Sequence, residues 1–529
     1  MAASLVTSPD VVKSDFYISE NESRLHVSKG LEPHYKPIGK YEGIHRYDLD
    51  FQWRPEEERR VVRKIDKRIC TWVCLMFFAL QLDRGNITQA LSDNMLPDLK
   101  MNTNDYNYGQ TIFYLCFLSA ELPSQLISKK LGPDRWIPVQ MVSWSLVASM
   151  QAFLSGRSSF FACRALLGLI EGGFIPDNIL YLSYFYTGWE LPARLSWFWV
   201  SCQLTQIVSA FFAYGILHLG GRNGLEGWRW LFALEGMLTG LIGIISYLYL
   251  PPSPTQTKSK FRGKNGWFTE EEEKIMVNRI LRDDPSKGDM HNRQALSFRM
   301  LWDCVQDYHM WPIYLIGLTW LIPSQPMTAY LTLQLKAIGF NTFQTNLLTI
   351  PAYVLFILQL LFWTWVSEKI NQRFLIGLVS QIWVLPLVIT LELIPAHASP
   401  WAKWAVSALV VGNPYVHAIL VAITSRNAGA VRTRTVASAI YNMCVQASSI
   451  MSQNIYRDDD KPLYRRGNKV LIAICAYNFL LFIGAKIYYV KVNRHRQIIW
   501  DSMTQEEKST YLETTKDKGN KRLDFRFAH

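Results

Sequence analysis

Long apolar runs alternate with short polar linkers through most of the chain. Each run approaches the length of about 20 residues that an α-helix needs to cross the hydrocarbon core of a bilayer. Twelve runs can be marked, at 69–90, 109–128, 137–154, 160–182, 195–217, 229–250, 311–331, 345–366, 374–393, 402–424, 434–454 and 470–490. The pattern predicts an all-α membrane protein with twelve transmembrane helices.

One long hydrophilic stretch interrupts this alternation in the middle of the chain and divides the runs into two sets of similar length. A duplicated six-helix unit, related by an axis along the membrane normal, would produce this division. We therefore expect two pseudo-symmetric six-helix bundles flanked by polar segments. The predicted parts are an N-terminal tail (1–65), a first bundle (66–250), a central linker (251–310), a second bundle (311–490) and a C-terminal tail (491–529).

The central linker contains one helical signal. Thr269 precedes four glutamates, Glu270–Glu273, and an apolar-periodic stretch, Ile275–Leu281. A threonine followed three residues later by a glutamate is typical of a capped helix start. We expect an amphipathic helix against the membrane face, and a solvated linker helix without chemistry is the alternative.

Composition agrees with the membrane interpretation. The 529 residues are 49% hydrophobic and 19% charged, and their mean hydropathy is +0.03, so apolar runs offset polar ends. These values exclude a small soluble module, a disordered chain and a disulfide scaffold. The eight cysteines lack metal-ligand spacing, and neither a metal, a disulfide nor another cofactor is predicted.

The net charge of +12 gathers in the segments that flank the apolar runs, which favours a role in membrane orientation over nucleic-acid binding. Seven cations precede the first run between Arg54 and Arg68, and more follow the last run from Lys491 onward. Because cytoplasmic loops carry excess Lys and Arg, both termini should be cytoplasmic. The basic loop at 457–469 disagrees with this orientation.

Charges inside the apolar runs are the most informative feature, because each costs about 2.5–3.5 kcal/mol at the centre of a membrane helix. Such charges must be paired or must line a hydrated cavity. An arginine remains protonated and could bind a substrate carboxylate with two hydrogen bonds, whereas a buried carboxyl group could carry a proton. We single out five charges in the first, second and fourth runs, namely Asp83, Arg84, Glu121, Arg164 and Glu171.

Arg164 and Glu171 are seven residues apart and share one helix face with Gly168, which we expect at the bundle interior. The pair Gly168 and Gly172 allows close approach of a neighbouring helix. We assign substrate binding to Arg84. The alternative is that these charges only lock helices together through ion pairs. Glu121 is either a second site that carries a proton or a polar group that takes part only in helix packing.

Other polar residues suggest a lining or a gate. Two pairs could form gates or helix-end salt bridges, Glu190 with Arg194 and Arg229 with Glu235. Prolines that could break helices are Pro323, Pro326 and Pro414, and polar groups beside such breaks could face a cavity. The candidate lining residues are Asn86, Gln325, Asn413, Tyr415 and Asn442. His417 is either a proton relay or a histidine bonded within the bundle.

Several motifs resemble the fungal allantoate permease branch of the major facilitator superfamily. They are Leu82–Ile87, Arg164 with Leu167–Pro176, Gly227–Phe232 with Glu235–Gly236, Asn427–Gly429 with Arg434, Asp460–Tyr464 with Gly467, and Arg522–Phe527. The resemblance implies the major facilitator fold and proton-coupled import of an organic anion such as allantoate, nicotinate, pantothenate or biotin at the plasma membrane.

The resemblance also assigns roles. Carriers of the wider group use residues matching Arg84, Arg164 and Glu171 for substrate binding and coupling, and we add Asp83 and Glu121 as proton-coupling candidates. The implied partners are a small organic anion, protons and the lipid bilayer, and we expect a monomer. An exporter of secondary metabolites and a nutrient sensor without transport are the alternatives. No enzyme motif such as HExxH or a nucleophile elbow occurs, so an enzyme is not expected.

Overall fold

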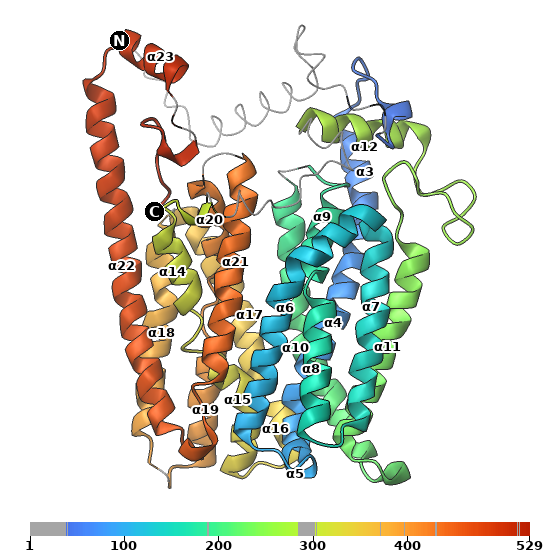
Figure 1. The fold of residues 1–529 in the computed structure, drawn as a ribbon, viewed down its shortest axis with the longest axis vertical. Helices are drawn as coiled ribbons and strands as arrows, with labels where there is room; N and C mark the ends of the chain where they lie inside the picture. The colour runs from blue at the N-terminus through green and yellow to red at the C-terminus, as the bar shows by residue number, and fades with distance from the viewer. Residues whose placement is uncertain are drawn as a thin grey trace, which may run out of the picture.

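The structure is a computed structural model that describes residues 37–529, apart from 38, 40, 188–189, 284–301, 303, 371, 396, 429–430, 516 and 518. The first 36 residues of the predicted N-terminal tail and residues 284–301 of the predicted linker lie outside the described residues. The described part consists mainly of helices (Figure 1).

Helices cover every apolar run of the first half. The helix α3 precedes these runs, and a π-helical turn, Asp66–Cys70, joins it to α4. The helix α8 continues after Gly172 and Gly173 as α9. The bounds are α3 Pro55–Ile65, α4 Thr71–Ala90, α5 Met95–Asp98, α6 Thr103–Leu131, α7 Pro133–Met150, α8 Arg157–Glu171, α9 Phe174–Leu182, α10 Leu191–Ile216 and α11 Gly227–Tyr249.

The second half repeats this arrangement with more interruptions. The predicted spans at 311–331 and 402–424 are each split into two helices. The bounds are α14 Trp311–Thr319, α15 Gln325–Ile338, α16 Thr342–Leu348, α17 Ile350–Ile370, α18 Arg373–Leu393, α19 Pro400–Val411, α20 His417–Asn427, α21 Val431–Gln453 and α22 Arg465–Ser502. The helix α12, Glu270–Asp283, lies in the linker before them, and α23, Gln505–Thr514, lies in the C-terminal tail.

Six helical segments among the described residues are long and apolar enough to cross a membrane by length and composition alone: Arg157–Leu182, Trp197–Leu219, Gly227–Tyr249, Thr342–Ser367, Arg373–Leu393 and Arg465–Ser502. The other predicted spans also form helices, but charges or breaks interrupt them. The helix α4 contains Asp83 and Arg84, and the split helices are each shorter than a bilayer.

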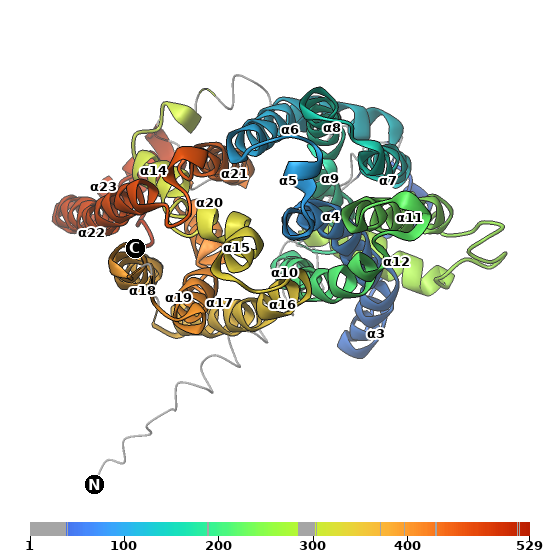
Figure 2. The ribbon, with the colours of Figure 1, turned by 90° about the horizontal axis from the view of Figure 1, so that it is seen from below.

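The helices form two groups, each around its own apolar core. Figure 2 shows α4–α11 on one side and α14–α22 on the other. Trp144 and Phe174 are buried in the first core, and Tyr441 and Phe482 are buried in the second. Large apolar side chains also cover the outside, where Leu480 is 70% exposed. An apolar exterior of this kind fits a protein surrounded by lipid.

The two groups are joined by hydrogen bonds at the end of the molecule that carries α5, which we name the α5 end (Figure 1). The Lys336 ammonium donates to the Ser92 carbonyl oxygen at 2.6 Å, and the Asn346 amide donates to the Ser92 hydroxyl at 3.0 Å. Asn107 donates to the Tyr456 carbonyl oxygen at 2.8 Å. The α12 helix and α23 lie at the opposite end, which we name the α12 end.

The helix predicted in the linker is present as α12. The Thr269 hydroxyl accepts from the Glu272 amide at 3.3 Å, and the Glu272 carboxylate accepts from the Thr269 amide at 3.0 Å. These two bonds form the expected cap. The Glu272 carboxylate also pairs with Lys64 of α3 at 2.6 Å, and Arg46 pairs with Glu273 at 2.9 Å. The linker helix is therefore attached to the segment before α4.

The expected close approach of a helix to Gly168 and Gly172 is confirmed. A Cβ added to Gly168 would lie 2.3 Å from the carbonyl oxygen of Phe113, and one added to Gly172 would lie 2.5 Å from that of Phe117. Only glycine therefore lets α8 approach α6 so closely. This contact places Arg164 and Glu171 of α8 beside the aromatic side chains of α6.

Candidate functional site

A cavity of about 250 Å³ lies between the two groups of helices, and both groups line it. Two of its walls come from helix breaks in the second half, between α14 and α15 and between α19 and α20. The polar lining residues are Arg84, Thr88, Tyr106, Gln110, Tyr114, Gln206, Ser324, Gln325, Thr328, Tyr353, Asn413, Tyr415 and Gln453. Arg84 is the one charged side chain among the described lining residues.

Arg84 and Glu171 form an ion pair beside this cavity. The Arg84 Nε donates to a Glu171 carboxylate oxygen at 2.7 Å, and the side chains are 19% and 1% exposed. The Arg84 guanidinium also lies over the Phe117 ring, 4.7 Å from its centroid. Its Nη2 is buried and has no hydrogen-bond partner among the described residues. The hydrogen-bonding capacity of the guanidinium is thus not fully used within the described part of the chain.

Arg164 lies deeper than Arg84 and is only 3% exposed. Its Nη2 donates to Gln110 Oε1 at 2.5 Å, and its guanidinium lies 4.4 Å from the Phe113 centroid. Arg164 is within electrostatic range of both Arg84 and Glu171. The structure therefore gathers two cations and one carboxylate on the α4, α6 and α8 side of the cavity.

Asp83, Asn86 and Glu235 do not line the cavity. Each of the three is almost fully buried between α4, α7 and α11, and Asp83 accepts a hydrogen bond from the Trp144 indole at 3.1 Å. Asp83 turns away from Arg84 because successive helical residues are rotated by about 100°. The roles predicted for Asp83 in proton coupling and for Asn86 in substrate binding therefore lack contact with this cavity.

Glu121 lies half-buried on α6 and outside the cavity lining, within electrostatic range of Asp177 on α9. Asp177 is fully buried and accepts a hydrogen bond from the Ser124 hydroxyl at 3.1 Å. Asp177 is not among the five charges singled out from the sequence, although it belongs to the same apolar run as Glu171. A complete count of acidic residues in that run could have found it.

The helix breaks expected near Pro323, Pro326 and Pro414 are present, at 320–324 and 412–416. They bring Gln325, Asn413 and Tyr415 into the cavity lining. The Asn413 amide nitrogen donates to the Val410 carbonyl oxygen at 3.0 Å, which leaves its side-chain oxygen available as an acceptor. Asn442 lies half-buried on α21 and outside this lining.

His417 begins α20 and is only 6% exposed. Its ring is stacked on Tyr441, with 5.6 Å between the centroids, and it contacts the edge of Trp199 across the two groups of helices at 5.7 Å. The Nδ1 atom has no hydrogen-bond partner among the described residues. Aromatic side chains therefore surround this histidine, and its role as a relay or as a packing group stays a prediction.

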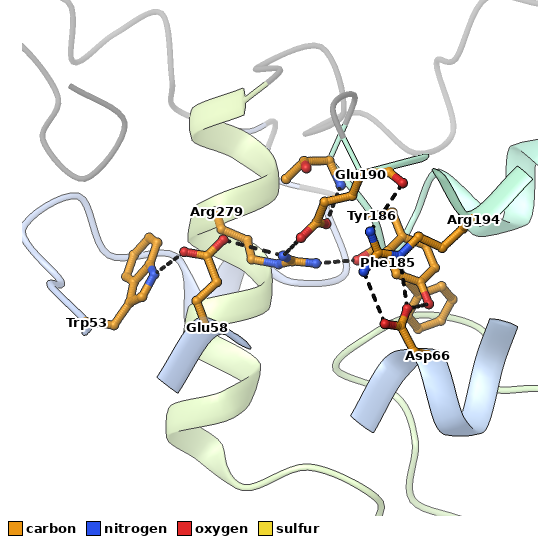
Figure 3. Close-up of polar contacts among 9 residues, drawn as sticks. Trp53, Glu58, Asp66, Phe185, Tyr186, Glu190, Arg194 and Arg279 are labelled. Carbon is orange, nitrogen blue, oxygen red and sulfur yellow. Dashed lines mark hydrogen bonds and ion pairs between the residues drawn. The ribbon is translucent and has the colours of Figure 1, made fainter. Parts of the chain in front are cut away.

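Glu190 and Arg194 at the α12 end each pair with another residue, which corrects the predicted salt bridge between them. Arg194 Nε donates to Asp66 at 3.0 Å, and Arg279 of α12 pairs with Glu190 at 2.9 Å (Figure 3). Arg279 also donates to the Phe185 carbonyl oxygen at 2.8 Å. The side chains find these partners because α12 and the start of α4 pack beside the start of α10.

Arg229 and Glu235 are also not a pair. Arg229 forms an ion pair with Glu226, and its Nη1 donates to the carbonyl oxygens of Ala152 and Leu154 at 2.7 and 3.0 Å. These bonds hold the start of α11 to the loop after α7 at the α5 end. Glu235 lies almost two turns further along α11 and faces the bundle interior.

The sequence interpretation missed several uncharged lining residues. Gln110, Gln206 and Gln453 come from α6, α10 and α21, and Tyr106 and Tyr353 are further members of the polar lining. Single glutamines and tyrosines are common on membrane helices, so their spacing alone is a weak signal. Only the packing of the two groups brings them together.

The family comparison agrees with this architecture. Residues 73–453 match the family Major Facilitator Superfamily. The chain is 45% identical to "Uncharacterized transporter YIL166C" of Saccharomyces cerevisiae over 516 residues, which is 97% of this chain and 93% of that protein. It is 32% identical to the "Putative tartrate transporter" of Agrobacterium vitis over 231 residues, 44% of this chain and 51% of that protein.

Solved structures show the same fold. The inward-facing, unoccupied structure of a bacterial homologue of the human lysosomal transporter Spinster matches with a TM-score of 0.62 at 13% identity, over 83% of this chain and 99% of that chain. The xylose transporter XylE of E. coli, partially occluded and inward open, matches with a TM-score of 0.56 at 14% identity, over 77% and 96%. The chain is therefore a multi-pass membrane transporter that belongs to the Major Facilitator Superfamily.

Proposed function

We propose that this transporter imports a small organic anion together with a proton, in the manner of the allantoate permease branch that its motifs resemble. The observation that carries the proposal is the orientation of Arg84, which lines the cavity between the two groups of helices and keeps Nη2 without a partner among the described residues. A guanidinium with a free donor is suited to bind a carboxylate.

The remaining lining narrows the class of substrate. The second half contributes amides and hydroxyls to the cavity, including Gln325, Asn413 and Tyr415, and no charged side chain among its described lining residues. This arrangement favours a solute with one carboxylate and an uncharged polar remainder, such as nicotinate, pantothenate or allantoate. The name of the tartrate relative supports a carboxylate-bearing substrate in general.

Coupling to a proton follows from competition for Arg84. A substrate carboxylate that takes over the guanidinium weakens its bond to Glu171, whose carboxyl group is only 1% exposed. An unpaired buried carboxylate is costly. Protonation of Glu171 removes this cost, so substrate and proton bind together more favourably than either does alone. Arg164 supports both steps, because its fixed charge keeps the site cationic.

The direction of access is part of the proposal. The hydrogen bonds at the α5 end close that side of the molecule, and the similar Spinster homologue is described as inward-facing. We place the α12 end and both termini in the cytoplasm of a plasma-membrane protein, as the distribution of Lys and Arg predicts. Alternating access would then require the α5-end contacts to break.

Uptake of labelled nicotinate, pantothenate and allantoate by cells that express the chain tests this function. At external pH 5 we expect accumulation of at least one of the three, less at pH 7, and loss of accumulation with a protonophore. Excess unlabelled acid should compete, whereas the matching amide, such as nicotinamide for nicotinate, should not.

Two outcomes would overturn the proposal. Competition by the amide as strong as that by the acid would remove the carboxylate from recognition. Movement of the tracer only out of the cytoplasm, measured in inverted vesicles, would identify an exporter instead.

A further inference from the structure

A second cavity, of about 740 Å³, opens on the outer surface of the α12 end, away from the cavity between the two groups of helices, which we name the transport cavity. Its walls come from α22, from the segment before α14 and from the C-terminal segment after α23. Figures 1 and 2 show α22 at the outer edge of the second helix group. We name this cavity the α22 pocket.

The α22 pocket is strongly basic. Lys491, His495, Arg496 and Lys521 line it, and its described lining includes no aspartate or glutamate. Asp307 acts electrostatically on His309 of the lining, and it accepts hydrogen bonds from the Asn520 amide at 2.6 Å and from the backbone N–H of His309. Two lysines and one arginine of the lining outnumber this one carboxylate.

One of these cations is held in place without a carboxylate. Arg496 is 7% exposed, and its Nη1 donates to the backbone carbonyl oxygens of Asn520 and Phe525 at 2.8 and 3.4 Å. Its Nη2 lies 3.4 Å from His309 Nε2. Burial and the nearby Arg496 and Lys521 lower the pKa of His309. The pocket therefore holds an excess of positive charge, which an anionic group would stabilise.

The position along α22 indicates where that anion comes from. The 38 residues of α22 extend about 57 Å, well beyond the hydrocarbon thickness of about 30 Å. The apolar run of this helix ends at Val490, so Lys491 lies where the helix reaches the headgroup layer. Tyr308 and Trp311 nearby are 60% and 54% exposed, as expected for aromatic side chains at a membrane interface.

An apolar stripe leads from the bilayer to the pocket. Leu480, Gly484, Ile487, Lys491 and His495 are spaced by three or four residues and share one face of α22. Leu480 and Ile487 are 70% and 48% exposed, and a Cβ added to Gly484 would meet nothing within 4 Å. This open stripe can carry an acyl chain below the basic groups.

We propose that the α22 pocket binds the phosphate-bearing headgroup of an anionic phospholipid, with an acyl chain along the Leu480–Ile487 stripe. Basic pockets beside transmembrane helices are suited to such headgroups. The stripe favours a lipid over a soluble phosphate compound, which would have no use for an apolar approach. The site is independent of the transported substrate.

Binding of a short-chain fluorescent phosphatidylinositol 4-phosphate to the purified full chain in detergent tests the proposal. The pocket variant is Lys491→Gln with Lys521→Gln, two exposed lysines of the lining. The control is Arg494→Gln with Lys508→Gln, which removes the same charge from α22 and α23 outside the lining. We expect the pocket variant to raise the Kd roughly 30-fold, and the control to leave it near that of wild type.

Three results would overturn the proposal. The first is equal affinity of wild type and the pocket variant, and the second is an equal loss in the control, which would show general charge attraction. The third is competition by soluble inositol 1,4-bisphosphate as strong as that by the lipid, which would identify a soluble ligand. Matching elution volumes and melting temperatures of all variants establish that each is folded. If the double variant does not fold, the single variant Lys491→Gln is compared with wild type instead.

Discussion

Arg84 lines the cavity, donates from its Nε to Glu171 and has no partner for its buried Nη2 among the described residues. Its charge is shielded from lipid by the Phe113 and Phe117 rings of α6. This arrangement explains how a charge can persist at membrane depth, where isolated charges are expensive. Among single residues, Arg84 is therefore the group on which the proposed substrate recognition depends most.

Replacement of Arg84 by glutamine should weaken substrate binding roughly 10- to 100-fold, because a hydrogen bond to a charged group contributes about 1.5–3 kcal/mol. Arg84→Lys should lose less, since it keeps the charge but not the planar fork. Displacement of a bound tracer from membranes measures both. The double variant Arg84→Gln with Glu171→Gln removes the buried unpaired carboxylate and serves as the control for folding. Wild-type affinity in Arg84→Gln would contradict this role.

The charges of the transport cavity could be found from the sequence, but the pairing of most charges could not. An arginine or glutamate in an apolar run is visible by itself, and the spacing of Arg164 and Glu171 places them on one face. Arg194, however, pairs with Asp66, 128 residues away, and Arg279 pairs with Glu190, 89 residues away. Such partners depend on how distant segments pack, and local spacing does not reveal them.

At the scale of elements, the contact between α6 and α8 positions the site. Gly168 and Gly172 let the two backbones approach, and Arg164 and Glu171 therefore lie against the aromatic side chains of α6. The apolar runs and the small-residue spacing predicted this helix and its close neighbour. The identity of that neighbour, α6, depended on the packing of the whole bundle.

Gly168→Ala should lower the melting temperature, because the new methyl group would lie 2.3 Å from the carbonyl oxygen of Phe113. Overpacking of this kind typically costs about 1–3 kcal/mol. Gly484→Ala is the matched control, since its new Cβ would meet nothing within 4 Å and alanine favours a helix by about 1 kcal/mol. Thermal denaturation followed by gel filtration compares the two. A melting temperature of Gly168→Ala at or above that of Gly484→Ala would show that α6 can move away from α8 without loss of stability.

At the scale of the whole molecule, two groups of helices enclose one cavity and meet at the α5 end through Lys336, Asn346 and Asn107. The duplication visible in the sequence predicted two groups, and the fold agrees. The conformation could not be predicted in this way, because contacts at one end or the other are alternative packings of the same sequence. In the proposed transport cycle, the molecule exchanges these packings while Arg84 and Glu171 stay at the shared cavity.

Proton coupling through Glu171 is tested by accumulation of labelled substrate in proteoliposomes under an imposed pH gradient, with wild type and Glu171→Gln compared. Exchange of labelled for unlabelled substrate without a gradient serves as the control for intact binding. We expect Glu171→Gln to exchange substrate but no longer to accumulate it when the gradient is applied. Accumulation by Glu171→Gln equal to that of wild type would show that the proton enters by another group and that Glu171 does not couple transport to it.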